Sequence, residues 1–128
     1  ILRVSWSLDL RRNCSMSCRI TTSEDFERRM KRLAKKYRSM KQDYALLLAS
    51  LTENPFQGAD LGQGLRKVCM AIASKGKGKS GGARVITYNV LLAATDTEVR
   101  LLYIYDKSER ETITDAEIQA LKIANGIE

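Results

Sequence analysis

The sequence predicts an α+β fold in which a helical hairpin packs on one face of a small, twisted, antiparallel sheet. Two amphipathic helical patterns lie early in the chain, three strand-like runs follow them without an intervening helix, and one more helical pattern lies near the C-terminus. The 128 residues are enough for one domain with a modest core. Together with a short extended run before the first helix, these patterns predict the order β-α-α-β-β-β-α.

The N-terminal residues 1–15 share little pattern with the rest of the chain, which resumes at Met16 with a short extended run. Two interpretations stay open for this segment. It is a non-native or upstream extension that ends before Met16, or it forms an extra strand in which Val4, Trp6 and Leu8 alternate. We therefore expect an N-terminal extension over 1–15 and a single domain over 16–128.

The first helix is predicted by capping-box spacing at Thr21 and Thr22, followed by an apolar stripe. The stripe recurs at i, i+4, i+7 and i+11, which places its members on one helical face. The remaining face is basic, because residues 27–41 hold eight Lys and Arg side chains against one Glu. The apolar stripe consists of Phe26, Met30, Leu33 and Tyr37.

A second helix is predicted from a capping box at Ser39 to the Asn54-Pro55 pair, which ends it. Its buried stripe is expected to be Tyr44, Leu47, Leu48 and Leu51. A tight turn joins the two helices, so we expect an antiparallel hairpin. Residues 57–64 contain three glycines and are predicted to be a loop.

Three strands are predicted at Leu65–Ile72, Arg84–Leu92 and Glu98–Tyr105, and a short turn joins the last two as an antiparallel meander. Alternation in the first strand directs Val68, Met70 and Ile72 towards the helices, and Lys67, Cys69 and Ala71 away from them. In the next strand, Arg84, Ile86 and Tyr88 share one face. We expect a positive, concave surface on the sheet face opposite the helix pair.

The final helix is predicted to begin at Thr114, where the residues Thr-Asp-Ala-Glu form a third capping box. Its apolar positions are Ile118, Leu121 and Ile123, and it ends at Asn125-Gly126.

Residues 74–84 contain four cations and four glycines between two strand-like runs. We call residues 74–82 the Lys/Gly loop. Ordering such a loop is costly, so we expect it to be mobile until an anionic partner, such as a phosphate-rich polymer, orders it. The net charge of +7 and the basic helix face favour the same class of partner, nucleic acid.

A loose Walker A pattern runs from Ala73 to Gly78-Lys79-Ser80 within this loop. A P-loop must lead directly into a helix whose N-terminal amides hold the phosphates. A strand-like run follows here instead, so the pattern does not predict an ATPase.

The chain contains no histidine, which excludes Ser-His-Asp and Cys-His catalysis, a histidine base and the common zinc sites that use His. The three cysteines, Cys14, Cys18 and Cys69, form no CxxC pair and indicate a reducing, cytoplasmic setting. No apolar run approaches a membrane span. We expect no metal, no cofactor and no membrane partner, and we expect Cys69 to line the core or a groove.

From Met16 onwards the sequence resembles the RelE/ParE superfamily of bacterial type II toxins. The more specific part is the Lys/Gly loop running into Gly-Gly-Ala-Arg-Val-Ile, with Tyr-Asp-Lys-Ser-Glu downstream, which resembles RelE-like members. The resemblance is carried by residues 26–37 (FERRMKRLAKKY), 54–55 (NP), 61–68 (LGQGLRKV), 74–86 (SKGKGKSGGARVI) and 104–109 (IYDKSE).

The resemblance implies the element order given above and an mRNA interferase, an endoribonuclease that cuts message at the ribosomal A site. It also implies a cognate antitoxin that silences the toxin, with mRNA and the ribosome as the other partners. In this family the 2′-hydroxyl attacks the adjacent phosphate, and Lys, Arg and Tyr side chains take the place of paired histidines. A chain without histidine suits that chemistry.

By resemblance, Lys67 matches a strand lysine of the family's active face, and Arg84 matches the arginine that begins the next strand. We expect Arg84 to point into the concave face and to hold the scissile phosphate. The resemblance, with the neighbouring cations and tyrosine, gives Lys67, Arg84, Tyr105 and Lys107 as catalytic candidates and Arg66, Lys75, Lys77, Lys79 and Arg110 as RNA-binding candidates.

The chain departs from the family pattern at three places. Cys69 stands where a second strand lysine is often found, and a lysine of the loop could substitute for it. Ser108, flanked by Lys107 and Arg110, stands where RelE has an arginine. The late catalytic tyrosine has no clear counterpart: Thr114 falls near it, and Tyr105 and Tyr88 are possible replacements.

Two other functions stay open. A ParE-like toxin would poison gyrase on the same scaffold without cleaving anything, and a degenerate toxin would only bind its antitoxin. The Lys/Gly loop, with Lys67 and Arg84, favours the ribonuclease.

Overall fold

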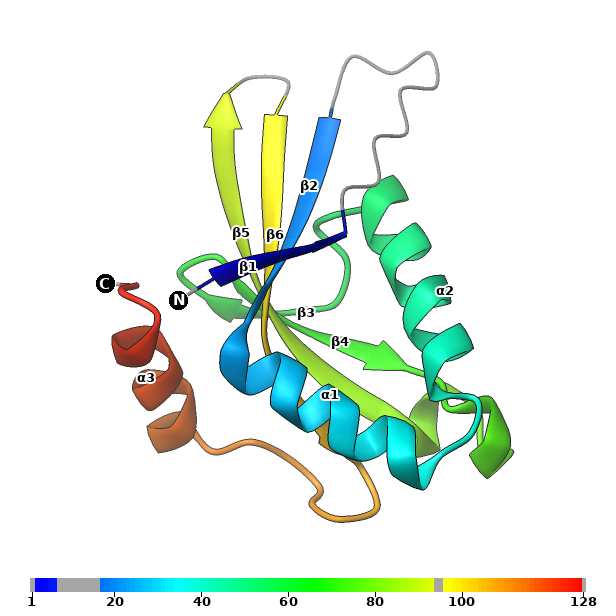
Figure 1. Ribbon diagram of the computed structural model, residues 1–128. Helices are drawn as coiled ribbons and strands as arrows, with labels where there is room; N and C mark the ends of the chain where they lie inside the picture. The colour runs from blue at the N-terminus through cyan, green and yellow to red at the C-terminus, as the bar shows by residue number, and fades with distance from the viewer. Residues whose placement is uncertain (1, 7–16, 94–95, 128) are drawn as a thin grey trace.

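Two helices cover one face of a mixed sheet and a third helix covers the other face, as Figure 1 shows. The computed structural model describes residues 2–6, 17–93 and 96–127. The predicted α+β class and the predicted order of elements are confirmed, with two additional strands. The elements are β1 (Leu2–Trp6), β2 (Ser17–Ser23), α1 (Glu24–Lys36), α2 (Met40–Glu53), β3 (Ala59–Gly62), β4 (Leu65–Met70), two 3₁₀ turns η1 (Ala73–Lys75) and η2 (Lys79–Gly81), β5 (Ala83–Ala93), β6 (Asp96–Asp106) and α3 (Asp115–Ala124).

The six strands lie in the order β1-β2-β6-β5-β4-β3. The predicted meander is confirmed, because β4, β5 and β6 pair antiparallel. The expectation of a wholly antiparallel sheet is wrong at one pair, since β2 and β6 run parallel. The reason is the crossover: α1 and α2 carry the chain over one face after β2, and the meander then returns to β2 with β6 in the same direction (Figure 1).

The loop predicted over residues 57–64 contains a strand instead. β3 pairs antiparallel with β4, with Ala59 opposite Lys67. The reversal between them uses Gly62, Gln63 and Gly64 at φ values of 91°, 53° and 85°, which is a conformation that glycine adopts at little cost. The glycines therefore mark a hairpin. Because β3 pairs with β4 only as far as Lys67, it leaves the outer edge of the second half of β4 uncovered.

Part of the N-terminal extension forms β1, which pairs antiparallel with β2 at the edge of the sheet. This agrees with the extra-strand interpretation for residues 2–6, whereas Leu8 lies outside the described residues. The domain division at residue 16 stays a prediction.

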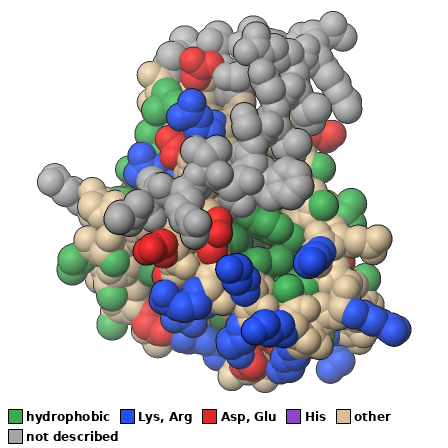
Figure 2. All heavy atoms as spheres, in the orientation of Figure 1, with side chains coloured by type: hydrophobic (Ala, Val, Ile, Leu, Met, Phe, Trp, Pro, Cys, Tyr) green, Lys and Arg blue, Asp and Glu red, His purple; other side chains and the backbone are tan. Residues whose placement is uncertain are grey.

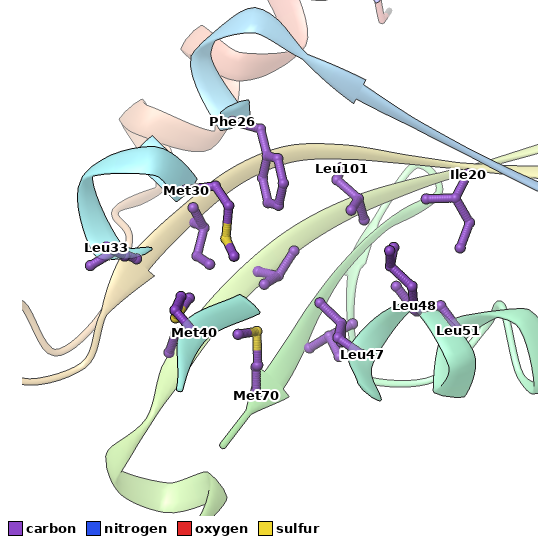
Figure 3. Packing of buried hydrophobic residues seen from close by; sticks show 14 of the residues in the cluster. Ile20, Phe26, Met30, Leu33, Met40, Leu47, Leu48, Leu51, Met70 and Leu101 are labelled. Atoms are coloured by element: carbon purple, nitrogen blue, oxygen red, sulfur yellow. The ribbon is translucent and has the colours of Figure 1, made fainter. Parts of the chain in front are cut away.

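The main core lies between the helix pair and the sheet. Figure 3 shows Phe26, Met30 and Leu33 of α1 pointing towards side chains of α2 and the strands. In Figure 1 the helices diverge from their connecting turn, so the predicted hairpin is an open one. The buried apolar side chains of this core are Ile20, Phe26, Met30, Leu33, Met40, Leu47, Leu48, Leu51, Val68, Met70, Ile72, Ala83, Val85, Val99, Leu101 and Ile104.

The helix starts differ from the sequence prediction in two of three cases. Ser23 caps α1, with its hydroxyl accepting a hydrogen bond from the Phe26 amide at 3.1 Å, because β2 continues through both threonines. The side chain of Ser39 makes no capping bond to α2. The capping box at Thr114 of α3 is confirmed.

A bulge in β6 changes which residues of this strand point to each face of the sheet. Tyr103 lies opposite Ile86 while Leu101 lies opposite Thr87, which leaves Leu102 as an extra residue. Leu101 and Ile104 therefore both lie in the core beneath the helix pair, whereas Tyr103 lies in the cluster on the other face.

Helix α3 covers that second face through Ile118 and the neighbouring Ile113 and Ile127. The predicted burial of Ile123 is wrong, since this side chain is 80% exposed. The next turn is held instead by Lys122, which is buried and donates a hydrogen bond to the Gln63 side chain in the β3–β4 hairpin.

Candidate nucleic-acid interface

Strand register brings several predicted site residues onto the sheet face opposite α1 and α2. Arg84 lies opposite Cys69 of β4 on one side and opposite Tyr105 of β6 on the other. Lys67 lies opposite Ile86, two residues along β5 from Arg84. Diagonal neighbours of this kind are about 7–8 Å apart. Lys67, Cys69 and Arg84 therefore form one patch of the sheet, as the alternation predicts, and the structure adds Tyr105 to it.

The Arg84 side chain does not point into solvent from this patch. Its exposure is 7%, so the expectation of an exposed guanidinium is wrong. Nη1 donates to the carbonyl oxygens of Lys79 at 2.9 Å and Ala83 at 3.2 Å, and Nη2 donates to that of Ser80 at 3.2 Å. The η2 turn folds back over the start of β5, and its inward carbonyls need donors. Arg84 supplies them.

The Lys/Gly loop is folded, contrary to the expectation of a mobile segment. Its two 3₁₀ turns are joined through Gly76 and Gly78 at φ values of 69° and 64°. At its end, Gly82 packs so closely on β4 that an added Cβ would lie 2.0 Å from the Met70 carbonyl oxygen. A strand follows η2 directly, which agrees with the rejection of a P-loop.

Lys75, predicted to bind RNA, is an internal residue. Its side chain is 7% exposed, and its Nζ lies 2.7 Å from Oδ1 of Asp106 at the end of β6. The Asp106 carboxylate is fully buried and also accepts hydrogen bonds from the Tyr37 hydroxyl and the Ser108 amide. Burial alone would raise the pKa of Asp106, but the hydrogen bonds from Lys75, Tyr37 and Ser108 outweigh it and hold that pKa well below its usual range.

The first turn of the loop is also fastened to the start of α2 (Figure 1). The buried carboxylate of Asp43 accepts hydrogen bonds from the Ala73 amide at 3.1 Å and the Ser39 hydroxyl at 2.7 Å. The Ser39 hydroxyl accepts one from the Ser74 amide at 2.9 Å. The Ser39 side chain thus bonds to the loop and does not form the predicted capping box.

Four lysines around the patch make no hydrogen bond or ion pair through their side chains with other described residues: Lys67, Lys77, Lys79 and Lys107. Lys77 and Lys79 are exposed, and Lys67 and Lys107 are partly exposed. The Lys107 amide donates to the Gly82 carbonyl at 3.0 Å, which places this residue beside the end of the loop. These lysines are the cations of this region that are free to meet a phosphate.

A groove of about 250 Å³ lies between α2 and the uncovered part of β4. Cys69 and Lys79 line it together with Leu46, Leu47 and Ala71. Cys69 is an exposed free thiol, so the expectation that it lines a groove is confirmed. The groove places Lys79, a lysine of the loop without a side-chain partner among the described residues, beside Cys69.

Tyr105 and Arg110 are closed in by the segment before α3. Tyr105 is 3% exposed, its hydroxyl has no hydrogen-bond partner of normal geometry among the described residues, and burial raises its pKa. Arg110 lies over the Tyr105 ring, at 5.5 Å from its centroid, and is ion-paired with Glu117. The hydrogen bond from Arg110 is the main cause that lowers the pKa of Glu117 to about 2. Arg110, predicted to bind RNA, is thus engaged within the protein.

Arg66, the remaining RNA-binding candidate, is partly exposed and donates to the Gly58 carbonyl at 3.1 Å. Its guanidinium therefore supports the segment that leads into β3. Tyr88, named as a possible replacement for the family's tyrosine, is partly buried against the second cluster and lies under the guanidinium of Arg100.

A second basic surface lies over α1 and the α1–α2 turn, where Figure 2 shows many Lys and Arg side chains. Some of these cations are paired: Arg29 with Asp25, and Arg32 and Lys36 with Glu109. Others are exposed and make no ion pair with other described residues. These are Lys31, Lys35, Arg38 and Lys41.

Within the described ranges, no helix is both long enough and apolar enough to cross a membrane. The same part of the chain contains no group of three or more His, Cys, Asp or Glu side chains arranged to hold a metal ion.

The family model described as the RelE toxin of the RelE / RelB toxin-antitoxin system matches residues 19–127. No curated protein matches the chain significantly. The matched region runs from β2 to the end of α3, so it includes the sheet patch, the Lys/Gly loop and the basic surface over α1, but not β1.

Proposed function

The chain belongs to the RelE toxin family of toxin-antitoxin systems, and we propose that it is a ribosome-dependent mRNA endoribonuclease. The observation that carries the proposal is the set of four unpaired lysines, Lys67, Lys77, Lys79 and Lys107, around one patch of the sheet. Family membership implies an antitoxin as a protein partner. The cytoplasm of a bacterium, where translation takes place, is the setting that this function requires.

The proposed reaction is a transesterification within the RNA chain. The 2′-oxygen forms a bond to the adjacent phosphorus while the bond from phosphorus to the 5′-oxygen breaks, which leaves a cyclic phosphate and a 5′-hydroxyl. The 2′-hydroxyl loses a proton to a base, and the leaving oxygen gains one from an acid. Cations stabilise the extra negative charge that develops on the non-bridging phosphate oxygens in the transition state.

We assign the charge stabilisation to lysines. Lys67 lies on the patch itself, Lys79 begins the η2 turn, and Lys107 lies beside Gly82 at the end of the loop. Burial moves the pKa of Tyr105 further above physiological pH, so its phenol carries a proton that it can donate to the leaving oxygen. Its hydroxyl reaches RNA only if the segment around Arg110 moves aside, since Tyr105 is buried beneath it.

The second basic surface supports binding to the ribosome. Exposed lysines along α1 can neutralise ribosomal RNA phosphates while the sheet patch faces the message. This division predicts that ribosome binding weakens steeply with salt, and that replacing Lys31 and Lys35 with Gln lowers ribosome affinity without changing the cleavage chemistry.

The test is the order of events after induction of the full chain in bacteria. Protein synthesis is followed by incorporation of labelled methionine, and DNA damage by a reporter of the damage response. The proposal predicts that protein synthesis falls first and that a Lys67→Gln, Lys79→Gln variant at matched expression is much less toxic. A damage response that rises first, with messages intact, would show a gyrase poison of the ParE type. Absence of any toxicity would indicate a protein that only binds its antitoxin.

A further inference from the structure

The C-terminal end of the Lys/Gly loop is held by Arg84. One guanidinium donates to the carbonyl oxygens of Lys79, Ala83 and Ser80, and it is buried while doing so. Two of these three carbonyls belong to the η2 turn. The η2 turn, which contains Lys79, is therefore fastened to the first residues of β5 by a single charged side chain.

The N-terminal end of the loop is held by Lys75. Its ammonium group pairs with the buried Asp106 carboxylate at 2.7 Å and also donates to the Ser108 hydroxyl. The same carboxylate accepts a hydrogen bond from Tyr37, at the end of α1. Lys75 thus ties the η1 turn to the end of β6 and to the helix pair.

Between these two ends, the loop exposes its other cations. Lys77 and Lys79 are exposed and have no hydrogen-bond or ion-pair partner for their ammonium groups among the described residues. The loop is also tight in its middle, because a Cβ on Gly81 would lie 2.5 Å from Cβ of Lys77. The four cations at 75, 77, 79 and 84 thus divide into two that point inwards and two that point outwards.

We propose that Lys75 and Arg84 are positioning residues that clamp the Lys/Gly loop at both ends, so that Lys77 and Lys79 are held in place before RNA arrives. The role of Lys77 and Lys79 in binding RNA rests on the proposed function. The clamp itself rests on the geometry alone. A loop that is ordered in the free protein loses little conformational entropy on binding. Arg84 then acts on RNA through the loop and does not itself contact the phosphate.

The first experiment separates phosphate contact from positioning by salt dependence. The probe is a fluorescent, fully 2′-O-methylated 12-mer RNA, which cannot be cleaved, and its affinity is measured by anisotropy over a series of KCl concentrations. Each lost phosphate contact reduces the slope of log K against log salt by about 0.7 for a single strand. We expect that reduction for Lys77→Gln and Lys79→Gln. Lys75→Gln and Arg84→Gln are expected to lower affinity several-fold with the wild-type slope.

Arg84→Lys is the matched control, because it keeps the charge and loses the planar arrangement of donors. A clamp requires the donors, so Arg84→Lys should behave like Arg84→Gln. If Arg84 contacts a phosphate instead, Arg84→Lys should restore the slope and most of the affinity. That result would overturn the proposal. A salt slope reduced in Lys75→Gln and Arg84→Gln by as much as in Lys77→Gln would overturn it too.

The second experiment needs no RNA. Amide hydrogen exchange, followed by mass spectrometry on peptides covering residues 73–84, should show protection in the free wild-type protein. Arg84→Gln and Lys75→Met should each speed exchange in this segment while α1 and β6 keep their protection. Met replaces Lys75 here because it keeps an apolar stem of similar length, in case Lys75→Gln does not fold. Wild-type exchange at the rate of an unstructured chain would overturn the clamp. A wild-type protein that binds neither RNA nor ribosomes would overturn the proposed function, and the exchange rates would still decide whether the loop is clamped.

Discussion

Replacement of Asp106 by Asn tests the buried ion pair directly. The carboxylate is fully buried and accepts hydrogen bonds from Lys75, Tyr37 and Ser108. Asn is almost the same size, so the change removes charge and leaves packing nearly intact. It leaves the Lys75 ammonium 93% buried without its counter-ion, since the exposure of that side chain is 7%.

Breaking one partner of a buried pair costs about 3–5 kcal/mol, because the remaining charge stays desolvated. For a domain of this length such a loss lowers the thermal midpoint by roughly 10–20 °C. The removal of Glu109 offers a comparison within the same cluster. Glu109 pairs with Arg32 and Lys36 at the surface, where such pairs contribute about 0–1 kcal/mol.

The assay is urea unfolding followed by circular dichroism, on wild type, Asp106→Asn, Glu109→Gln and the double variant Asp106→Asn, Lys75→Met. The double variant removes the stranded charge and should recover a large part of the stability that Asp106→Asn loses. A cost below about 1 kcal/mol for Asp106→Asn, equal to that of Glu109→Gln, would refute the view that this pair fastens the loop.

The pH dependence gives a second check on the same residue. The folded-state pKa of Asp106 is lowered, so its contribution to stability is present above the unfolded-state pKa of about 3.9 and is lost as pH falls below it. The stability difference between wild type and Asp106→Asn should therefore be constant near neutral pH and should shrink below about pH 4. A difference that grows in acid would contradict this sign.

Three further predictions concern single positions. Gly82→Ala should destabilise the domain by several kcal/mol, because the added Cβ would meet the Met70 carbonyl oxygen. Gly76 has open space around it, so Gly76→Ala should cost only about 1 kcal/mol for its positive φ. Equal thermal midpoints for the two variants would contradict this packing. Iodoacetamide at pH 7.5 should label the exposed Cys69 and spare Cys18, because burial raises the pKa of Cys18 to about 11. Peptide mapping that finds both cysteines labelled equally would show that Cys18 is accessible. Thr114→Ala should cost about 1 kcal/mol in urea unfolding by removing the capping box of α3, and Thr112→Ala, outside the box, should cost less.

Much of the fold could be predicted because its determinants are local. Apolar spacing placed both helices of the pair, and alternation correctly assigned Val68, Met70 and Ile72 to the face beneath them. The parts that could not be predicted depend on contacts between distant segments. The pairing of β2 with β6 is one of these, and the burial of Lys122 against Gln63, 59 residues away, is another.

The same reasoning explains the candidate site. Alternation along the two strands predicted that Lys67 and Arg84 share a face, because side-chain direction follows from the strand period, and the observed register agrees. The sequence could not reveal that Lys75 is internal, since its partner Asp106 lies 31 residues away at the end of another strand. It likewise could not reveal that Arg84 turns back onto carbonyls, because that depends on the path of the loop. The sequence grouped Lys75 with Lys77 and Lys79 as RNA-binding lysines, whereas in the folded loop Lys75 is buried and the other two are exposed.

Primer extension on messages from bacteria that express the full chain tests the proposed ribonuclease most directly. We predict new 5′ ends within translated codons soon after induction, their loss from a message whose start codon is mutated, and a strong reduction of cleavage in Lys67→Ala at matched expression. Growth arrest with intact messages, or unchanged cleavage in Lys67→Ala, would contradict the assignment of endoribonuclease activity to this face of the sheet.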